Sequence, residues 1–469
     1  MMNRHNRLRS SSVNRREVLA GAAIGGGVMI ATSGAMLGGG RSVAAQDVTL
    51  SFWTPGGSPA FCDMHNEVSQ EYASQNPGIA FNEVQCGVGS GEDYSQVFLA
   101  AVAGGNPPDA TVLWSSPVGY GARGALVALD DLMQDSTYAK AENWPPGVLE
   151  SCQFNGQTFG LPVAAPMYRM WYNRELFESK GIPSDRESFP KTWDELRELS
   201  KEFTTWDGDY LAAAGFIPFR DPITLPIWAA LNGSQLYDAE TQTYSINAEP
   251  NIAMMEYAVE WLNEEYKGDI TLVEQAGSWS AYPGDDGQPP AFQEGRLAMC
   301  ETGSWMMGDF YEYIEPAFEE WDVASYPVGP GGSTSVSGYW PNWLAIPQGS
   351  EHVDEAFAYL DYLSGEGIVK WFEVVPDMPA NLMVPEVLPQ VVVEKRGEEF
   401  AAEIMGVFRD LAEIATPMWN SPIEDFVNDQ LAIAVERIMT KASTPSDALT
   451  QAQNAAEQEL DNFLRSNAD

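Results

Sequence analysis

Residues Tyr168–Leu196 read YRMWYNRELFESKGIPSDRESFPKTWDEL, and this stretch decides the fold. Three large aromatic rings stand within its first five residues, which is typical of a buried strand and not of a surface connection. Asn173 can then cap a short helix that ends at Gly181. Thr192 starts a second helix, and Glu195 three residues later completes a capping box. A buried aromatic strand followed by two short capped helices predicts a chain that leaves one lobe and begins another, and small ligands are commonly held between two lobes.

The residues before this stretch alternate between strand and helix patterns. Strands are predicted over 48–53, 79–84 and 110–114, with helices over 59–74 and 94–103. Crossovers of this length between strands predict a parallel α/β sheet. Asn155-Gly156 marks a tight hairpin shortly before the aromatic stretch.

The residues after this stretch are mainly helical as far as residue 318. Short strands are predicted over 297–301 and 343–346, one helix over 353–363, and further helices over 400–464 with breaks at prolines. The chain has 469 residues and is 44% hydrophobic, so it can bury more than one ordinary core.

The first 45 residues have the pattern of an export signal. Arg15-Arg16 precedes an uncharged stretch that runs to Gly40, and small residues surround Ala45. The paired arginines predict a twin-arginine signal that is cleaved near Ala45. An uncleaved membrane anchor is the alternative, but eight glycines between Val18 and Gly40 make that stretch a poor spanning helix. We therefore expect an exported protein, periplasmic or on the outer face of the cytoplasmic membrane.

The charge balance is strongly acidic, with 67 acidic and 25 basic residues and a net charge of −42. Removing residues 1–45 takes away six Arg and one Glu, leaving 19 basic and 66 acidic residues, or −47. Nucleic acid is excluded as a partner because phosphate binding needs a basic surface. Most of the carboxylates are expected to form a hydrated surface.

The four cysteines have no CxxC spacing, which disfavours a zinc site. Export permits disulfides, and Cys62 early in the first helix is best placed to pair with Cys86 at the end of the next strand. Cys152 and Cys300 are expected to be separate buried thiols.

Material for catalysis is scarce. The chain has three histidines, one of them in the export signal, and it lacks the motifs GxSxG, HExxH and GxxxxGK[ST]. We therefore expect a protein that is not an enzyme and that has no cofactor and no metal site.

Eight stretches in chain order carry a family resemblance. They read TLSFWT at 49–54, AAVAGGNPPDATV at 100–112, GQTFGLP at 156–162, WYNRELFESKGI at 171–182, TWDEL at 192–196, FQEGRLAMCETGSW at 292–305, SGYWPNWLAIP at 337–347 and TPSDALTQAQ at 444–453. Together they resemble the extracellular solute-binding proteins of ABC importers, in the sugar-binding branch typified by maltodextrin receptors. The loop at 54–59 departs from those receptors, which carry charged and amide ligand contacts there, and this leaves the identity of the sugar open.

The resemblance implies a two-lobed α/β fold of the periplasmic-binding-protein type, each lobe a mostly parallel sheet flanked by helices. Lobe 1 is expected at 46–165 and 337–376, and lobe 2 at 168–335 and 395–469. The hinge crossings are expected at 166–171, at 335–339 and within 376–389. The resemblance also implies a monomer that docks on the membrane subunits of an ABC importer.

Candidate ligand residues are aromatic rings and nearby polar groups, because sugars present apolar C–H faces ringed by hydroxyls. Trp53 and Trp114 end predicted strands, beyond which ligands of open α/β sheets bind. The family places a stacking tryptophan at Trp305 and an aromatic residue at Trp419. The full predicted set is Trp53, Trp114, Ser115, Ser116, Trp171, Glu301, Trp305, Tyr339, Trp340, Asn342 and Trp419. Five other tryptophans are interpreted as core residues, namely Trp193, Trp206, Trp261, Trp321 and Trp343.

The sequence therefore predicts a carrier that captures a carbohydrate, favouring an oligosaccharide, between two closing lobes. One alternative is a carrier for a polyamine or quaternary amine, held by tryptophans and acids. The other is a secreted glycosidase, since 67 acidic residues always offer some suitable pair of carboxylates.

Overall fold

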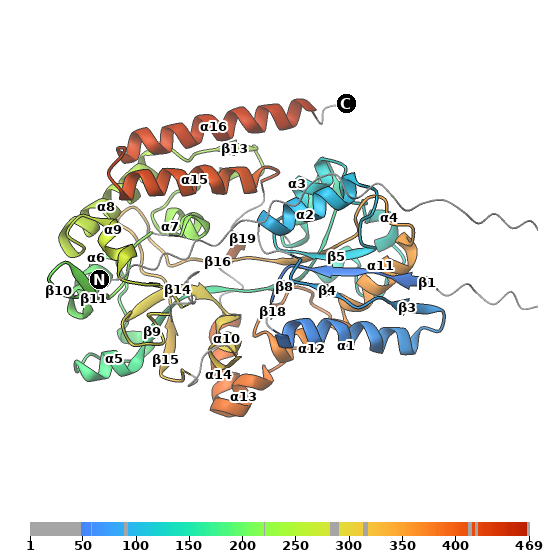
Figure 1. The fold of residues 1–469 in the computed structure, drawn as a ribbon, viewed down its shortest axis with the longest axis horizontal. Coiled ribbons are helices and arrows are strands. Elements are labelled where there is room, and N and C mark those ends of the chain that lie inside the picture. Colours follow the sequence, from blue (N-terminus) through green and yellow to red (C-terminus); the bar gives the residue numbers. More distant parts are fainter. Residues whose placement is uncertain are drawn as a thin grey trace, which may run out of the picture. The chain divides into compact units, whose positions relative to one another are not determined.

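A six-stranded sheet forms the centre of the first lobe in the computed structural model, and a three-stranded sheet forms the centre of the second (Figure 1). The structure describes residues 48–57, 59–88, 92–145, 147–219, 221–281, 290–312, 318–410, 415–417 and 421–466. The predicted export segment 1–45, its cleavage site near Ala45 and the predicted ligand residue Trp419 lie outside these ranges.

The first sheet combines strands from the beginning of the chain with strands from its last third. Its order is β18 (Met378–Pro379), β8 (Leu161–Ala165), β17 (Asn342–Ala345), β5 (Ala110–Leu113), β2 (Phe52–Thr54) and β4 (Gln85–Cys86). Strand β2 pairs in parallel with β4 and β5, whereas β17 pairs antiparallel with both β5 and β8, and β18 pairs antiparallel with β8. A separate parallel pair joins β1 (Val48–Leu50) to β3 (Ile79–Phe81).

The prediction of mostly parallel sheets is wrong for both lobes. In the first lobe, β8 leads out toward the second lobe and β17 returns from it, so the two strands run in opposite directions. In the second lobe, β9 (Tyr168–Asn173) lies between β14 (Met299–Gly303) and β15 (Trp321–Ala324), and both pairings are antiparallel. Within the two main sheets, the parallel pairings are confined to the N-terminal strands, where helices provide the crossovers.

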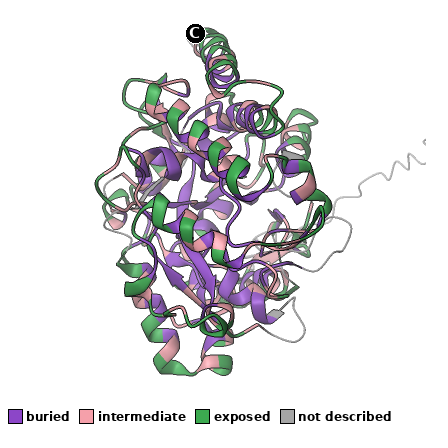
Figure 2. Cartoon of the chain, turned by 90° about the vertical axis from the view of Figure 1, so that its left-hand side faces the viewer, coloured by how far each residue is buried: buried purple, intermediate pink, exposed green. Residues whose placement is uncertain are grey.

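Helices cover the first sheet on its outer sides. Helix α1 (Pro59–Gln75) contacts β3 and α12 (Val369–Val374), and α11 (Val353–Leu363) contacts β1 and β5. Helix α2 (Glu92–Ala103) precedes β5 along the chain. Figure 2, seen from the side of the second lobe, shows the same arrangement there, with buried strands and exposed outward faces of the surrounding helices.

The stretch that decides the fold forms the predicted elements. All six residues of β9 are buried. The side chain of Asn173 accepts a hydrogen bond from the Leu176 N–H (3.1 Å) and caps α5 (Arg174–Ser179). Thr192 and Glu195 form the predicted capping box of α6 (Trp193–Phe203). Gly181 has φ +68°, a conformation that favours glycine after a helix.

The C-terminal part of the chain is helical. It contains α13 (Gln390–Arg396), α14 (Glu398–Arg409), α15 (Glu424–Met439) and α16 (Pro445–Ser466). Helices α15 and α16 pack on each other and on α8 (Glu249–Glu265) of the second lobe. Near the far end of α16, the Phe463 ring contacts Phe154 in the hairpin β6–β7 (Gln153–Phe154, Gln157–Thr158), with centroids 5.8 Å apart. None of the described helices is both long and apolar enough to cross a membrane.

The chain passes between the two sheets at three places. Residues 166–167 connect β8 to β9, residues 340–341 connect β16 (Ser337–Tyr339) to β17, and a segment after β18 leads to α13. Strand β16 pairs in parallel with β19 (Ala415–Pro417), and both lie between the two main sheets in Figure 1. The two lobes are therefore joined by several crossings, as the family resemblance implies.

The cysteines are arranged as the sequence favours. Cys62 and Cys86 form a disulfide with a Cα–Cα distance of 5.7 Å. Cys152 and Cys300 are free and buried. The link connects α1 to β4 at the edge of the first sheet.

His65 lies in the core of the first lobe. Its side chain is 1% exposed and packs between Phe52, Phe61 and Trp371, with ring centroids 5.5, 4.6 and 5.4 Å away. Neither ring nitrogen has a hydrogen-bond partner among the described residues. Burial lowers the pKa of His65 to about 3, so the neutral imidazole packs as one more aromatic ring.

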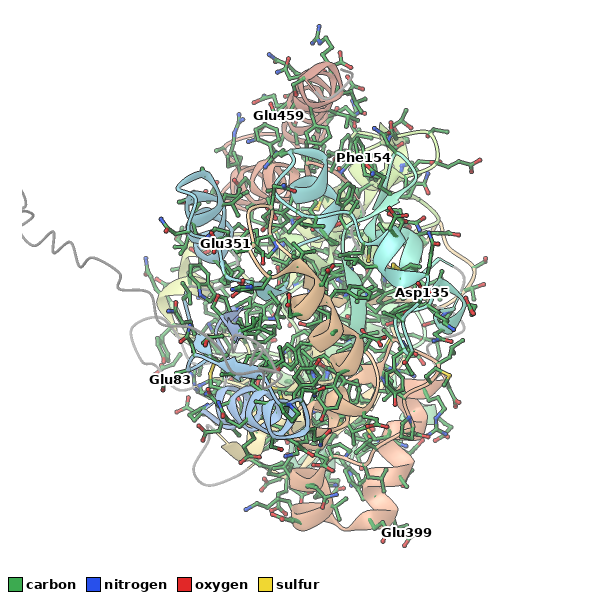
Figure 3. All side chains as sticks on the ribbon, turned by 90° about the vertical axis from the view of Figure 1, so that its right-hand side faces the viewer. Glu83, Asp135, Phe154, Glu351, Glu399 and Glu459 are labelled. Atoms are coloured by element: carbon green, nitrogen blue, oxygen red, sulfur yellow. A yellow bond between two sulfur atoms is a disulfide. The ribbon has the colours of Figure 1, made fainter. Side chains whose placement is uncertain are left out.

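The surface carries many of the carboxylates. Figure 3 labels Glu83, Asp135, Glu351 and Glu399, and all four are exposed. This agrees with a hydrated acidic surface.

Candidate functional site

The candidate site is built where the chain passes between the lobes. Trp114 follows β5, and its carbonyl oxygen accepts a hydrogen bond from the indole N–H of Trp340. The backbone N–H of Trp340 donates to the Pro166 carbonyl (3.1 Å). Three segments that are distant in sequence therefore meet at the hinge, and two half-buried tryptophans lie side by side there.

Trp53 extends this aromatic group along the first sheet. It lies on β2, opposite Thr111 of the neighbouring strand β5, and is half-buried. Trp53 and Trp114 thus stand at the carboxyl ends of neighbouring parallel strands, the edge at which α/β sheets bind ligands.

Trp305 approaches the hinge from the second lobe. Its half-buried ring meets the Tyr168 ring edge-on, with centroids 5.2 Å apart and an interplanar angle of 77°. A Cβ at Gly303 would lie 1.8 Å from the Trp305 ring, so glycine at that position lets the ring lie against the strand. The glycine at position 303 is therefore required for this orientation of the Trp305 ring.

Asp377 fixes the backbone near Trp305. The hydroxyl of Ser304 donates to one carboxylate oxygen of Asp377 (3.1 Å), and the Trp371 indole N–H donates to the other (3.2 Å). The Met167 N–H in turn donates to Ser304 Oγ (3.4 Å). Burial raises the pKa of Asp377 to about 6. This network ties two hinge crossings to the strand that leads to Trp305.

Glu301 lies two residues before Gly303 on the same strand. Its carboxylate accepts hydrogen bonds from the Thr224 hydroxyl (2.8 Å), the Trp228 indole N–H (2.9 Å) and the Tyr326 hydroxyl (3.3 Å). Burial raises its pKa to about 8, and the charge of Asp221 adds to the shift. Glu301 therefore holds α7 (Leu225–Leu231) against β14, the strand that leads to Trp305.

A small pocket of about 20 Å³, with room for about one water molecule, has Ser116 in its wall, two residues after Trp114. Its lining comes from α3 (Pro117–Ala122) and its flanks and from the start of α15: Ser116, Gly119, Tyr120, Arg123, Ser421, Pro422, Ile423, Glu424, Asp425 and Phe426. The Ser116 N–H donates to Glu424 Oε1 (2.7 Å), which links the two lobes directly. A Cβ at Gly119 would lie 2.7 Å from the Pro422 carbonyl oxygen, so only glycine permits this close approach.

The structure brings most of the predicted ligand residues to the hinge. Tyr339 forms an isolated bridge with Met167, and Asn342 pairs with Ala164, both as buried residues. Ser115 is half-buried beside Trp114. The role of Ser116 is mainly structural, because its side chain caps α3 and its N–H donates a hydrogen bond to Glu424.

The prediction of Trp171 as a ligand residue is wrong, because Trp171 is a core residue. Its ring is 0% exposed and packs against Phe310 and Trp321, and its indole N–H donates to the Thr302 carbonyl (3.0 Å). β9 is the central strand of its sheet and is covered on both faces, so a position near the hinge does not bring Trp171 to the surface. Of the five tryptophans interpreted as core residues, Trp206 is half-buried and the other four are 0–1% exposed.

The sequence reasoning missed Glu424, Tyr120 and Asp377. Two acids at the start of a helix read as favourable partners of the helix dipole, which hides a further role for Glu424. Tyr120 and Asp377 carry no local pattern that separates them from other buried polar residues.

Comparisons with known proteins agree with this architecture. The family model described as bacterial extracellular solute-binding protein matches residues 63–370. A putative binding protein of Brucella abortus is 25% identical over 315 residues, covering 63% of this chain and 67% of that protein. The diacetylchitobiose binding protein of Streptomyces coelicolor is 31% identical over 150 residues, or 31% of each chain.

Solved structures share the fold. CpMnBP1 with mannotriose bound has a TM-score of 0.72 at 22% identity and covers 87% of this chain and 100% of its own. The maltose/maltodextrin-binding domain of Bdellovibrio bacteriovorus bound to maltotriose has a TM-score of 0.67 at 19% identity, covering 88% and 100%. Because the family model matches well over half of the chain, this protein belongs to the bacterial extracellular solute-binding proteins.

Proposed function

We propose that this protein captures an oligosaccharide between its two lobes and delivers it to the membrane subunits of an ABC importer. The observation that carries the proposal is the group of half-buried tryptophans Trp53, Trp114, Trp305 and Trp340 around the hinge. Flat aromatic faces stack on the C–H faces of sugar rings, and the carboxylates and hydroxyls nearby can bind the sugar hydroxyls.

Similar proteins support a carbohydrate as the ligand. The relatives include a diacetylchitobiose binding protein and an arabinooligosaccharide-binding protein. Structures with the same fold hold mannotriose and maltotriose. All four of these named sugars are longer than one unit, and although another structure of the same fold holds the monosaccharide tagatose, the larger number favours an oligosaccharide.

Binding and delivery would follow from closure of the lobes. A ligand that contacts both lobes binds the closed form more tightly and shifts the population toward it. The importer would then recognise the closed form. In this proposal residues 1–45 direct export through the twin-arginine route, are removed near Ala45, and leave a monomeric carrier without enzymatic activity.

A thermal-shift screen of residues 46–469 tests the proposal. The panel contains mono- and oligosaccharides together with polyamines and betaines, and a ligand that binds only the native state raises the melting temperature. We expect a hit among the oligosaccharides, confirmed by calorimetric titration, that Trp305→Ala abolishes. Trp206→Ala is the matched control, because Trp206 is also half-buried but lies in the hairpin β10–β11 (Thr205–Asp207, Tyr210–Ala213).

Other outcomes would contradict the proposal. Hits confined to cations would favour a carrier for a polyamine or quaternary amine. Sustained release of reducing ends from a bound glycan would establish a glycosidase instead.

A further inference from the structure

The pocket between α3 and α15 contains a buried carboxylate that has a hydrogen-bond partner at only one of its two oxygens. Glu424 is 4% exposed, and its Oε1 accepts the hydrogen bond from the Ser116 N–H (2.7 Å). Its Oε2 is buried and has no hydrogen-bond partner among the described residues. A buried acceptor without a donor is unfavourable and rare in native proteins, so this atom requires an explanation.

The groups around Glu424 do not supply the missing donor. Arg123 and Tyr120 line the same pocket, but neither forms a hydrogen bond with Oε2. Asp425 adds a second negative charge, and Tyr244 lies close enough to Glu424 for the charge to affect its hydroxyl. Burial, followed by the charge of Asp425, raises the pKa of Glu424 well above its usual value.

We propose that Glu424 is a specificity-determining residue of the ligand site, and that its Oε2 binds a hydroxyl group at one end of the bound sugar. This inference rests on the function proposed above. The pocket has about 20 Å³ of free space, enough for one water molecule or one hydroxyl group, so it can receive a single hydroxyl at the end of an oligosaccharide and not a sugar ring. Its lining residue Ser116 is two residues after Trp114, on which the rest of the ligand would stack.

A hydroxyl group fits this position better than a cation does. A hydroxyl can donate to the ionised carboxylate and can accept from the protonated carboxyl group, so it pairs with Glu424 in either state. An ammonium group needs the ionised state, which burial and the neighbouring Asp425 disfavour at Glu424.

The same contact links ligand recognition to closure. Ser116 belongs to the first lobe and Glu424 begins a helix that packs on the second, so Oε1 is fixed only when the lobes are together. The sugar hydroxyl then meets an acceptor whose position depends on the closed arrangement. A ligand that lacks this hydroxyl would leave Oε2 buried and unpaired.

The test combines a variant with modified ligands. Affinities of the sugar found in the screen, and of analogues that each lack one terminal hydroxyl, are measured by calorimetry for the wild type and for Glu424→Leu. We expect Glu424→Leu to bind the full sugar about tenfold or more weakly than the wild type does. One analogue, which lacks the hydroxyl that Glu424 recognises, should bind the wild type as weakly as the full sugar binds Glu424→Leu. For Glu424→Leu, loss of that same hydroxyl should cost no further affinity. Glu436→Leu, the same substitution at an exposed position of α15, should bind like the wild type.

Two results separate the possible failures. Equal affinity of wild type and Glu424→Leu for the full sugar, or the absence of coupling to any hydroxyl, overturns the inference and leaves the sugar carrier intact. A wild type that binds no sugar in the panel overturns the proposed function and this inference with it. If the Glu424→Leu protein does not fold, the same cycle is measured with Glu424→Gln, which keeps the shape of the side chain and should lower the coupling about threefold or more.

Discussion

The buried imidazole of His65 should make this protein sensitive to acid, and replacing it with leucine should remove that sensitivity. In the native state its pKa is lowered to about 3 by burial, while in the unfolded chain it returns to the ordinary value of 6.5. Below pH 6.5 the unfolded chain therefore binds a proton at His65 that the native state does not bind. The stabilisation is complete above pH 6.5 and is lost progressively as the pH falls toward 3.

The magnitude follows from the two pKa values. Each unit of pH between them costs about 1.4 kcal/mol, so between pH 7 and pH 4 His65 alone should lower the free energy of unfolding by about 3 kcal/mol. Leucine is close to histidine in size, is apolar, and binds no proton, so His65→Leu should remove this term and also two unpaired buried nitrogens.

Urea unfolding at several pH values, followed by tryptophan fluorescence, measures the effect. We expect the free energy of unfolding of His65→Leu to fall by about 3 kcal/mol less than that of the wild type between pH 7 and pH 4. Buried carboxylates also titrate in this range, but they are common to both proteins and cancel in the difference. His352→Gln is the control, since His352 is half-buried at the start of α11, and it should follow the wild type. Parallel curves for wild type and His65→Leu would refute the reasoning.

Two further predictions concern the hinge region. The pKa of Glu301 is raised to about 8 in the fold, so its contribution to stability is full below pH 4.5 and is lost as the pH rises through 8. Between pH 5 and pH 8 the free energy of unfolding of Glu301→Gln should therefore rise by about 2 to 4 kcal/mol relative to that of the wild type. Urea unfolding at the two pH values measures this, and an unchanged difference between the two proteins would contradict it. Gly119→Ala places a Cβ 2.7 Å from the Pro422 carbonyl oxygen and should hold the lobes apart, with sugar affinity lowered about tenfold and a larger radius of gyration in X-ray scattering. Gly406→Ala, where no atom lies within 4 Å of the added Cβ, is its control, and equal losses in both variants would count against a clash between the lobes.

Local chemistry made part of the fold predictable. The caps at Asn173 and Thr192 depend on residues three positions away, so the sequence alone places α5 and α6. The short separation of 24 residues similarly favours the link between Cys62 and Cys86. The direction of strand pairing was not predictable in this way, because it depends on how the chain crosses the hinge.

The candidate site was also predictable only where it depends on local sequence. Strand ends indicated Trp53 and Trp114, whereas the aromatic run around Trp171 could equally face a ligand or the core, and only the partners of β9 decide for the core. Glu424 was hidden because its partner Ser116 lies 308 residues earlier in the chain. Contacts over such separations leave no local pattern.

The interleaved first sheet affects the order in which this protein can fold. Strand β17, which begins at residue 342, lies between β5 and β8, both of which are complete by residue 165. A nascent chain shorter than about three-quarters of its length therefore lacks the strand that joins the two halves of this sheet. Closing that contact spans residues 166–341, which include the whole second sheet. Contacts over such long loops form slowly. The first lobe should consequently remain incomplete during most of synthesis, and the two lobes cannot be separated by cutting the chain at one linker.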